Sequence, residues 1–391
     1  MAVPLPDAET VNLVPPDAAE TEQLARAVAT AAAGPGGITE IQRAVVNATV
    51  EAMSGYELDV AELAPLGPDE FAEVMRRRNL AFRERMVQVM LLLELLLVPL
   101  PPEVTKQVEE YAAALGVEDH MLRVTDRIAR GSLGLALIDF ERSGYFQTML
   151  ERPPAHLHTA AALDDAWQGV GDDPELAARW EALEHCPEGS LGRGVWRFYE
   201  ARGFTFPGSA GSAPPTLAQH DWIHVLADFG STVECEIEVF GFISRANDDP
   251  AAFALLAMVL GLFETGYLFN AAKGFFEYDR GHLSRDADRM AVRLADAMAR
   301  GANAAWFLDD HGRDDETDFL ATDWFEFADW SLPDVRRHFG VPAKSAKALA
   351  AGSVTPWEAG GISPFQYSHG REAAEATGRE YDSYGATPVD G

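Results

Sequence analysis

Apolar residues recur at three- and four-residue steps along much of the chain, and this spacing limits the kind of fold that it can adopt. Between residues 80 and 93 the pattern is carried by Leu80, Phe82, Met86, Val89, Met90 and Leu93. Such spacing places apolar side chains on one face of an α-helix. The apolar–polar alternation that is typical of strands is scarce, so we predict an all-α fold.

Prolines and glycines indicate where the helices of the first half should end. Pro99, Pro101 and Pro102 should stop the helix that begins near residue 80, because proline lacks an amide hydrogen. Residues 104–115 and 120–129 are predicted as two further helices, which Gly116 separates. We therefore expect residues 1–150 to form a helical bundle.

A stretch rich in proline, glycine and aspartate, between residues 152 and 174, is typical of a domain boundary. We predict a second domain over residues 151–350, which is again helical by pattern. Glycine, proline, serine and acidic residues are frequent in residues 351–391, so we predict an irregular tail there. The expected architecture is thus two helical domains, the second being a bundle with a metal site and an apolar groove.

The charge balance and the cysteine content narrow the possible partners. The 391 residues include 62 acidic and 31 basic side chains, a net charge of −31, so we expect no nucleic-acid partner. Cys186 and Cys235 are too few for a disulfide framework, which favours a reducing compartment. The N-terminus lacks the pattern of a signal peptide. We expect a cytoplasmic protein.

The most apolar stretch, residues 86–98, contains Gln88 and Glu94 and is shorter than the ~20 apolar residues that cross a bilayer. We interpret it as a buried core helix. This interpretation leaves room for peripheral contact with a membrane.

His220, Asp221 and His224 form an HDxxH motif, and Glu236 follows after eleven further residues. On a helix the two imidazoles lie one turn apart on one face, which is how a helix presents two nitrogen ligands to one metal ion. Histidines with this spacing also occur on surfaces and in cores, so the motif alone leaves those interpretations open.

Glu236 cannot join the histidines on one straight helix, because twelve residues at ~1.5 Å each would place it ~18 Å from His224. We predict that the chain turns back. Gly230 would end the first helix in a left-handed conformation, and residues 231–234 would start a second helix with a capping box made by Ser231 and Glu234. Two histidines and two carboxylates suit Zn²⁺, Fe²⁺ or Mn²⁺, and the carboxylates also allow Mg²⁺.

The motif, at this spacing, resembles the hallmark of the ubiquinone (coenzyme Q) biosynthesis family, of the coenzyme Q biosynthesis protein four type. Residues 186–204 are similar to the family's entry segment, with its Leu-Gly, tyrosine and Gly-Phe positions. Residues 330–341 are similar to its terminal helix. The resemblance covers about residues 172–342.

The resemblance implies a divalent metal ion, commonly zinc, held by His220, Asp221, His224 and Glu236. Asp221 is also a candidate catalytic, proton-handling group. The resemblance further implies an apolar groove for the tail of a polyprenylated quinone precursor. The candidate groove residues are Phe240, Phe242, Leu255, Met258, Leu262 and Phe263. The alternative is that these residues are ordinary core.

Two functions follow from the resemblance. One is a metal-dependent decarboxylase, a lyase that removes the C1 carboxylate of a prenylated hydroxybenzoate, with or without oxidation. The other is a non-catalytic scaffold that binds the lipid for other quinone-biosynthesis enzymes. We expect a homo-oligomer in either case. A third interpretation, an HD-type phosphohydrolase, needs another histidine upstream, for which His185 is nearest, but the spacing to Glu236 argues against it.

The N-terminal helices are similar to TerB-like bundles in residues 79–117. In those bundles the loop carries acidic metal ligands, whereas residues 98–102 here read Val-Pro-Leu-Pro-Pro, so no metal role carries over. A general helical interaction domain is the alternative, which we favour.

Overall fold

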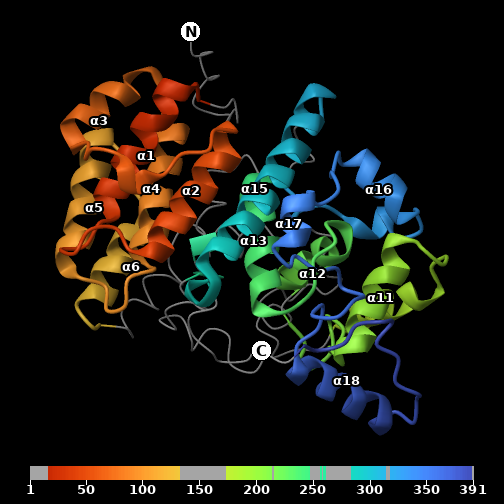
Figure 1. Cartoon of the computed structure of the whole chain (residues 1–391). Helices are drawn as coiled ribbons and strands as arrows, with labels where there is room; N and C mark the ends of the chain where they lie inside the picture. The colour runs from red at the N-terminus through yellow and green to blue at the C-terminus, as the bar shows by residue number, and fades with distance from the viewer. Residues whose placement is uncertain are drawn as a thin grey trace. The chain divides into compact units, whose positions relative to one another are not determined.

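The computed structural model describes residues 16–132, 173–213, 215–246, 256–257, 259–260, 283–313 and 318–389. Every regular element in these ranges is a helix, and the only β-type pairings within them are isolated bridges (Figure 1). The prediction of an all-α fold is confirmed.

The chain divides into two compact units, and both are discontinuous in sequence. The first comprises Met1–Thr148 and Phe240–Trp306, and the second comprises Met149–Val239 and Phe307–Gly391. This division differs from the continuous domains 1–150 and 151–350 that we predicted. A stretch rich in proline and glycine indicates where the chain leaves a unit, but it carries no signal for a later return to that unit.

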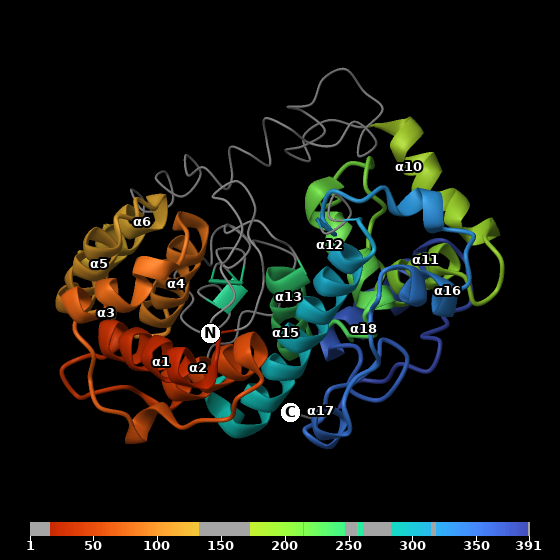
Figure 2. The ribbon, with the colours of Figure 1, turned by 90° about the horizontal axis from the view of Figure 1, so that it is seen from above.

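The first unit contains a bundle of six α-helices that the views in Figures 1 and 2 show packed side by side. They are α1 (Ala18–Ala32), α2 (Glu40–Ser54), α3 (Pro68–Val74), α4 (Leu80–Glu94), α5 (Pro102–Leu115) and α6 (His120–Ala129), with the 3₁₀ turns η1 (Val60–Glu62) and η2 (Met75–Arg77). Gly116 ends α5 in the left-handed conformation, at φ 67°, as a C-terminal glycine commonly does. The 3₁₀ turn η7 (Ser284–Asp286) also belongs to this unit.

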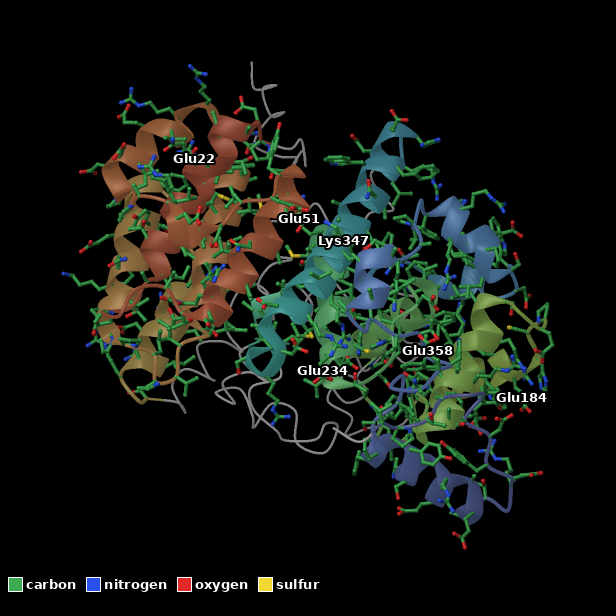
Figure 3. All side chains as sticks on the ribbon, viewed as in Figure 1. Glu22, Glu51, Glu184, Glu234, Lys347 and Glu358 are labelled. Carbon is green, nitrogen blue, oxygen red and sulfur yellow. The ribbon has the colours of Figure 1, made fainter. Side chains whose placement is uncertain are left out.

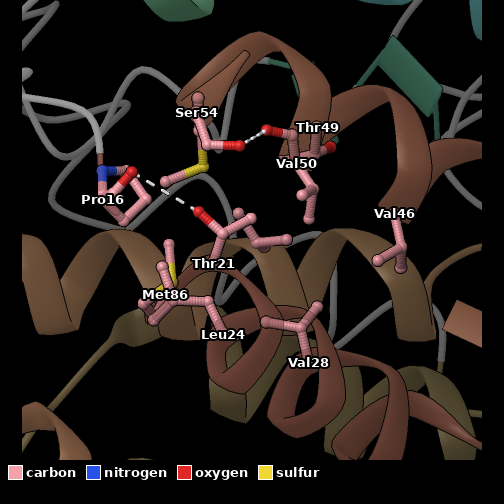
Figure 4. Close-up of a pocket in the computed structure, with 11 residues that line it drawn as sticks. Pro16, Thr21, Leu24, Val28, Val46, Thr49, Val50, Ser54 and Met86 are labelled. Carbon is pink, nitrogen blue, oxygen red and sulfur yellow. Dashed lines mark hydrogen bonds between the residues drawn. The ribbon is translucent and has the colours of Figure 1, made fainter. Parts of the chain in front are cut away.

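Helix α4 is the buried core of this bundle. Its residues from Arg85 to Glu94 are all buried, which confirms the interpretation of the apolar stretch as a core helix over residues 86–94. The helix ends at Glu94, and Val98 at the end of the stretch is exposed. A small apolar pocket lies between α1, α2 and α4, with Leu24, Val46 and Met86 in its wall (Figure 4). The Ser54 hydroxyl at this pocket donates to the Val50 carbonyl, and no titratable side chain lines it. The pocket therefore offers apolar contact and no reactive group.

The second unit is built around α11 (Leu191–Arg202), α12 (Pro215–Leu226) and the beginning of α13 (Val233–Ala246). The division between the units falls within α13 and within α15 (Ala287–Asp310). The remaining elements of the second unit are α10 (Pro174–Glu181), η4 (Ala182–His185), η9 (Trp324–Phe327), α16 (Leu332–His338), α17 (Ala346–Ala350) and α18 (Pro364–Ala376).

The C-terminal region is ordered, so the prediction of an irregular tail over residues 351–391 is wrong. Helix α18 begins with a capping box between Ser363 and Gln366 and packs against α11. Gly370 permits this contact, because a Cβ there would lie 2.2 Å from the Ala201 carbonyl oxygen. Three residues of the types that suggested disorder have structural roles here. Ser363 caps α18, Pro364 is its first residue, and Gly370 allows its close contact with α11.

Acidic side chains lie on the outside of both units. Glu22 in the first unit and Glu184 and Glu358 in the second are exposed (Figure 3). None of the helices in the described ranges combines the length and the apolar character needed to cross a bilayer.

Candidate metal centre

Helix α12 carries three side chains that meet at one point. His220, Asp221 and His224 each contribute one potential ligand atom, and these atoms lie within 4.8 Å of one another. The side chains are buried, and His224 has no exposed surface. Their one-turn spacing on α12 places both imidazoles on the same face, as the motif predicts. A buried His-Asp-His cluster of this kind can hold a metal ion.

Helix α13 brings Glu236 against both histidines. The carboxylate spans the two imidazoles, with 3.3 Å between Oε2 and His220 Nε2 and 3.3 Å between Oε1 and His224 Nε2. The chain therefore turns back between α12 and α13, and a residue twelve positions away in sequence reaches both histidines. We refer to His220, Asp221, His224 and Glu236 together as the HDHE cluster.

The backbone fixes which nitrogen of each imidazole faces the cluster. His224 Nδ1 lies 2.7 Å from the Gly230 carbonyl oxygen, and His220 Nδ1 contacts the Leu217 carbonyl oxygen. A carbonyl oxygen only accepts hydrogen bonds, so the hydrogen of each neutral ring sits on Nδ1. When both rings are neutral, both Nε2 lone pairs are available. Histidine ligands in metalloproteins are commonly oriented in this way, through the nitrogen that does not bind the metal.

The ring of His224 is also held by stacking. It lies on the Phe198 ring of α11, with 5.1 Å between centroids and 25° between planes. The imidazole is therefore held by a hydrogen bond at one end and by ring contact along its face.

This arrangement can accommodate a cation at its centre. With hydrogen on Nδ1, the Nε2 lone pairs face carboxylate oxygens, which are also acceptors. His224 Nε2 and Glu236 Oε2 are buried and have no hydrogen-bond partner among the described residues. A divalent metal ion would satisfy both orphaned atoms at once. The donor set of two nitrogens and two carboxylates fits such an ion.

Protons can supply part of that positive charge. Burial alone would lower the pKa of His220, but the carboxylates of Asp221 and Glu236 outweigh it and raise the pKa to about 9. Burial would raise the pKa of Glu236, but the two histidines outweigh it and lower the pKa to about 2. Burial raises the pKa of Asp221. The cluster thus favours an ionised Glu236 beside a positive charge.

Tyr199 is a site residue that we did not assign from sequence. Its hydroxyl donates a 2.5 Å hydrogen bond to Asp221 Oδ2, which leaves Oδ1 on the side of His220 Nε2, 3.5 Å away. Tyr199 is buried, and its ring stacks on Phe206 with 5.2 Å between centroids and 7° between planes. Burial and the Asp221 carboxylate raise the pKa of Tyr199 well above its usual value. The tyrosine inside residues 186–204 was the only signal that could have pointed to it.

The turn between α12 and α13 differs in detail from our prediction. The left-handed residue is Asp228, at φ 68°, and not Gly230. Gly230 is required for another reason, because a Cβ there would lie 2.8 Å from Gly361 Cα. The spacing of the sequence predicts the turn, whereas the contact that requires glycine is with Gly361, far away in sequence.

Ser231 does not act as the predicted cap of the second helix. Helix α13 begins at Val233, one residue later than a box made by Ser231 and Glu234 would start it. The Ser231 hydroxyl instead donates to Gln366 Oε1 at 2.8 Å and accepts from Arg202 Nε. These two tertiary contacts replace the local cap.

Three of the other predicted site residues lie in the described part of the chain: His185, Phe240 and Phe242. His185 is exposed on η4, whereas the cluster is buried, which removes the support for a phosphohydrolase site. Phe240 and Phe242 are buried in the first unit. Gly301 of α15 allows close packing there, since a Cβ on it would lie 2.1 Å from the Phe242 carbonyl oxygen. Four predicted groove residues lie outside the described residues: Leu255, Met258, Leu262 and Phe263.

Comparison with known proteins adds no family assignment. No protein-family model, no curated protein and no solved structure matches the chain. The geometry of the HDHE cluster and the resemblance of its motif therefore carry the functional argument.

Proposed function

We propose that the protein binds one divalent metal ion at the HDHE cluster and uses this site on a polyprenylated aromatic acid in quinone biosynthesis. The observation that carries the proposal is the convergence of two Nε2 atoms, each with its Nδ1 held by a backbone carbonyl, on the carboxylate of Glu236. Zinc is the metal that we favour, and iron or manganese would also suit these ligands.

Each residue has a distinct part in this proposal. His220, His224 and Glu236 would hold the metal ion, and Asp221 would bind through the oxygen that Tyr199 leaves unused. When bound, the metal ion supplies a Lewis acid that polarises a carboxylate or phenolate oxygen of the substrate. The carboxylate of Asp221 and the hydroxyl of Tyr199 form the hydrogen-bonded pair beside it that can hold a proton.

One observation favours a second function, in which the site holds the lipid without turnover. The four side chains of the HDHE cluster have exposed fractions between 0% and 7%. Structural metal sites are closed by four protein ligands, whereas catalytic sites keep an open position. The scaffold function, in which the protein presents a prenylated intermediate to partner enzymes, would need no open position.

Metal analysis of the purified protein tests the shared part of both functions. We expect about one divalent ion per chain in the wild type, loss of that ion in His224→Ala, and no loss in His311→Ala, whose side chain is exposed outside the cluster. Equal metal content in the wild type and His224→Ala would contradict the site.

Mass spectrometry after incubation with a prenylated hydroxybenzoate separates the two functions. A lyase would release carbon dioxide and leave the prenyl-phenol without its ring carboxylate. A scaffold would return the acid unchanged after co-purifying with it. A protein that neither binds nor changes the acid would rule out both uses of the site.

A further inference from the structure

We propose that Arg202 and Gln366 are positioning residues for the metal site, and that residues 353–366 set its geometry through the turn between α12 and α13. This inference rests on the proposed metal binding and adds residues far from the ligands in sequence. We call residues 353–366 the C-terminal segment and residues 227–232 the ligand turn.

The ligand turn controls two of the four ligands directly. The Gly230 carbonyl oxygen accepts from His224 Nδ1 at 2.7 Å and so orients that imidazole. The same turn ends one residue before α13, so its path sets where the helix begins. Because Glu236 lies in the first turn of α13, a shift of that start would move its carboxylate away from both histidines.

The C-terminal segment binds the backbone of this turn at successive residues. The Gly230 amide donates to the Val354 carbonyl at 3.0 Å, and the Ser231 amide donates to the Gly361 carbonyl at 3.0 Å. The Gln366 side-chain amide both donates and accepts a hydrogen bond at Ser231. Its Nε2 donates to the Ser231 carbonyl at 3.0 Å, and its Oε1 accepts from the Ser231 hydroxyl at 2.8 Å.

Arg202 joins the same contacts from α11. Its guanidinium is fully buried and donates to the Ser231 hydroxyl, to the Gly361 carbonyl at 2.8 Å and to the Pro356 carbonyl at 3.3 Å. One side chain therefore ties the ligand turn to the C-terminal segment. Several donors in a fixed plane make arginine suited to this task.

The contact is also close enough to depend on glycine. A Cβ on Gly230 would lie 2.8 Å from Gly361 Cα and 2.9 Å from the Gly361 carbonyl oxygen. Two backbones that touch in this way leave no room for the ligand turn to relax toward the C-terminal segment. The hydrogen bonds and the close approach together hold the turn in one conformation.

The geometry can be tested with Co²⁺, whose visible spectrum reports the coordination of the metal. Gln366→Met keeps the length of the side chain and removes its hydrogen bonds. Ser231→Ala removes the hydroxyl that both Gln366 and Arg202 contact. Because alanine is no larger than serine, we expect this variant to fold. Tyr381→Phe is the matched control, because it removes a 2.9 Å hydrogen bond from the C-terminal region to Ala201 of α11 and leaves the ligand turn untouched.

We expect Gln366→Met and Ser231→Ala, in the full chain, to weaken Co²⁺ binding by roughly 10- to 100-fold in competition with a chelator, as loss of outer contacts to metal ligands does elsewhere. We also expect a changed Co²⁺ spectrum in both. Tyr381→Phe should match the wild type in both measurements. If Gln366→Met does not fold by circular dichroism, Ser231→Ala decides the result.

Two negative outcomes have different meanings. If the wild type and both variants bind Co²⁺ with equal affinity and equal spectra, the C-terminal segment only supports the fold and this inference is wrong. If the wild type itself binds neither Co²⁺ nor Zn²⁺, the proposed metal function is wrong, and the inference falls with it.

Discussion

The Tyr199 hydroxyl donates a 2.5 Å hydrogen bond to one oxygen of Asp221, and both side chains are buried. The two residues come from different helices, α11 and α12, so the bond joins the helix that carries three of the candidate ligands to its neighbour. A buried carboxylate with one oxygen satisfied in this way can direct its other oxygen toward a single partner.

Removal of that hydroxyl should destabilise the second unit more than an ordinary tyrosine hydroxyl would. We expect Tyr199→Phe to lower the free energy of unfolding by roughly 1.5–3 kcal/mol, because the bond ends on an ionisable group. Tyr381→Phe removes a bond to the neutral Ala201 carbonyl and should cost about 1 kcal/mol. Urea unfolding of both metal-free variants measures the difference. An equal loss of unfolding free energy in the two variants would show that the bond to Asp221 stabilises the protein no more than a bond to a neutral carbonyl.

Metal removal should expose a pH dependence that the bound ion hides. The pKa of His220 is about 9, above its ordinary 6.5, so its contribution to stability is full below pH 6.5 and is lost as the pH rises through 9. The pKa of Glu236 is about 2, below its ordinary 4.5, so its contribution is full above pH 4.5 and is lost as the pH falls toward 2. The metal-free protein should therefore be most stable between these windows.

Urea midpoints of the chelator-treated protein, measured at about pH 6 and above about pH 9, check this expectation. Zn²⁺ should raise the midpoint most at the higher pH, because the ion replaces the lost proton. A midpoint that does not respond to chelator or to Zn²⁺ at either pH would contradict metal binding at the cluster.

Glu94 should make the first unit sensitive to pH. This residue, the last of α4, has no exposed surface, and burial raises its pKa to about 8. The Thr125 hydroxyl lowers this pKa and the Glu109 carboxylate raises it, but burial outweighs Thr125. Since the folded carboxyl keeps its proton to a higher pH than the unfolded one, the free energy of unfolding should fall as the pH rises from 4.5 to 8, by roughly 1 kcal/mol per pH unit.

Glu94→Gln should remove that slope and should be more stable than the wild type above pH 8. Glu103→Gln, an exposed glutamate on α5 that does not act on the pKa of Glu94, is the matched control and should keep the slope. Urea unfolding across the pH range, followed by circular dichroism, provides the measurement. A slope that survives in Glu94→Gln would place its origin elsewhere.

Gly230→Ala should disturb the metal site through backbone contact alone. The added Cβ would lie 2.8 Å from Gly361 Cα, so the ligand turn or the C-terminal segment must move. We expect a loss of roughly 1–3 kcal/mol in the free energy of unfolding together with weaker Zn²⁺ binding. Gly36→Ala, where a Cβ would meet nothing within 4 Å, should change neither by more than about 0.5 kcal/mol or twofold. Isothermal titration with Zn²⁺ distinguishes the two variants.

The fold class and many helix boundaries could be predicted because they depend on local chemistry. Apolar spacing and Gly116 identify α5 and its end, and the predicted helix over residues 120–129 coincides with α6. The division into units could not be predicted, because it depends on residues 240–306 belonging with the first part of the chain. The composition of a short segment does not indicate which distant part of the chain it packs with.

The HDHE cluster was predictable to the extent that one helix and one turn create it. The spacing of His220 and His224 and the distance to Glu236 sufficed to predict a chain reversal. Tyr199 and Gln366 were not predictable in the same way, because each acts through a contact between elements that are far apart in sequence. The prediction of a capping box was wrong for the same reason, because the Ser231 hydroxyl bonds to Arg202 and Gln366.

From the contact between Gln366 and Ser231 we also expect an order of events during synthesis of the protein. The candidate ligands between His220 and Glu236 leave the ribosome well before residue 366 exists. Until that residue has been made, the ligand turn lacks the partners that hold it, and a nascent chain offers only a loose set of histidines and carboxylates. We therefore expect the ion to be acquired after translation has passed residue 366, when the whole second unit can close around it.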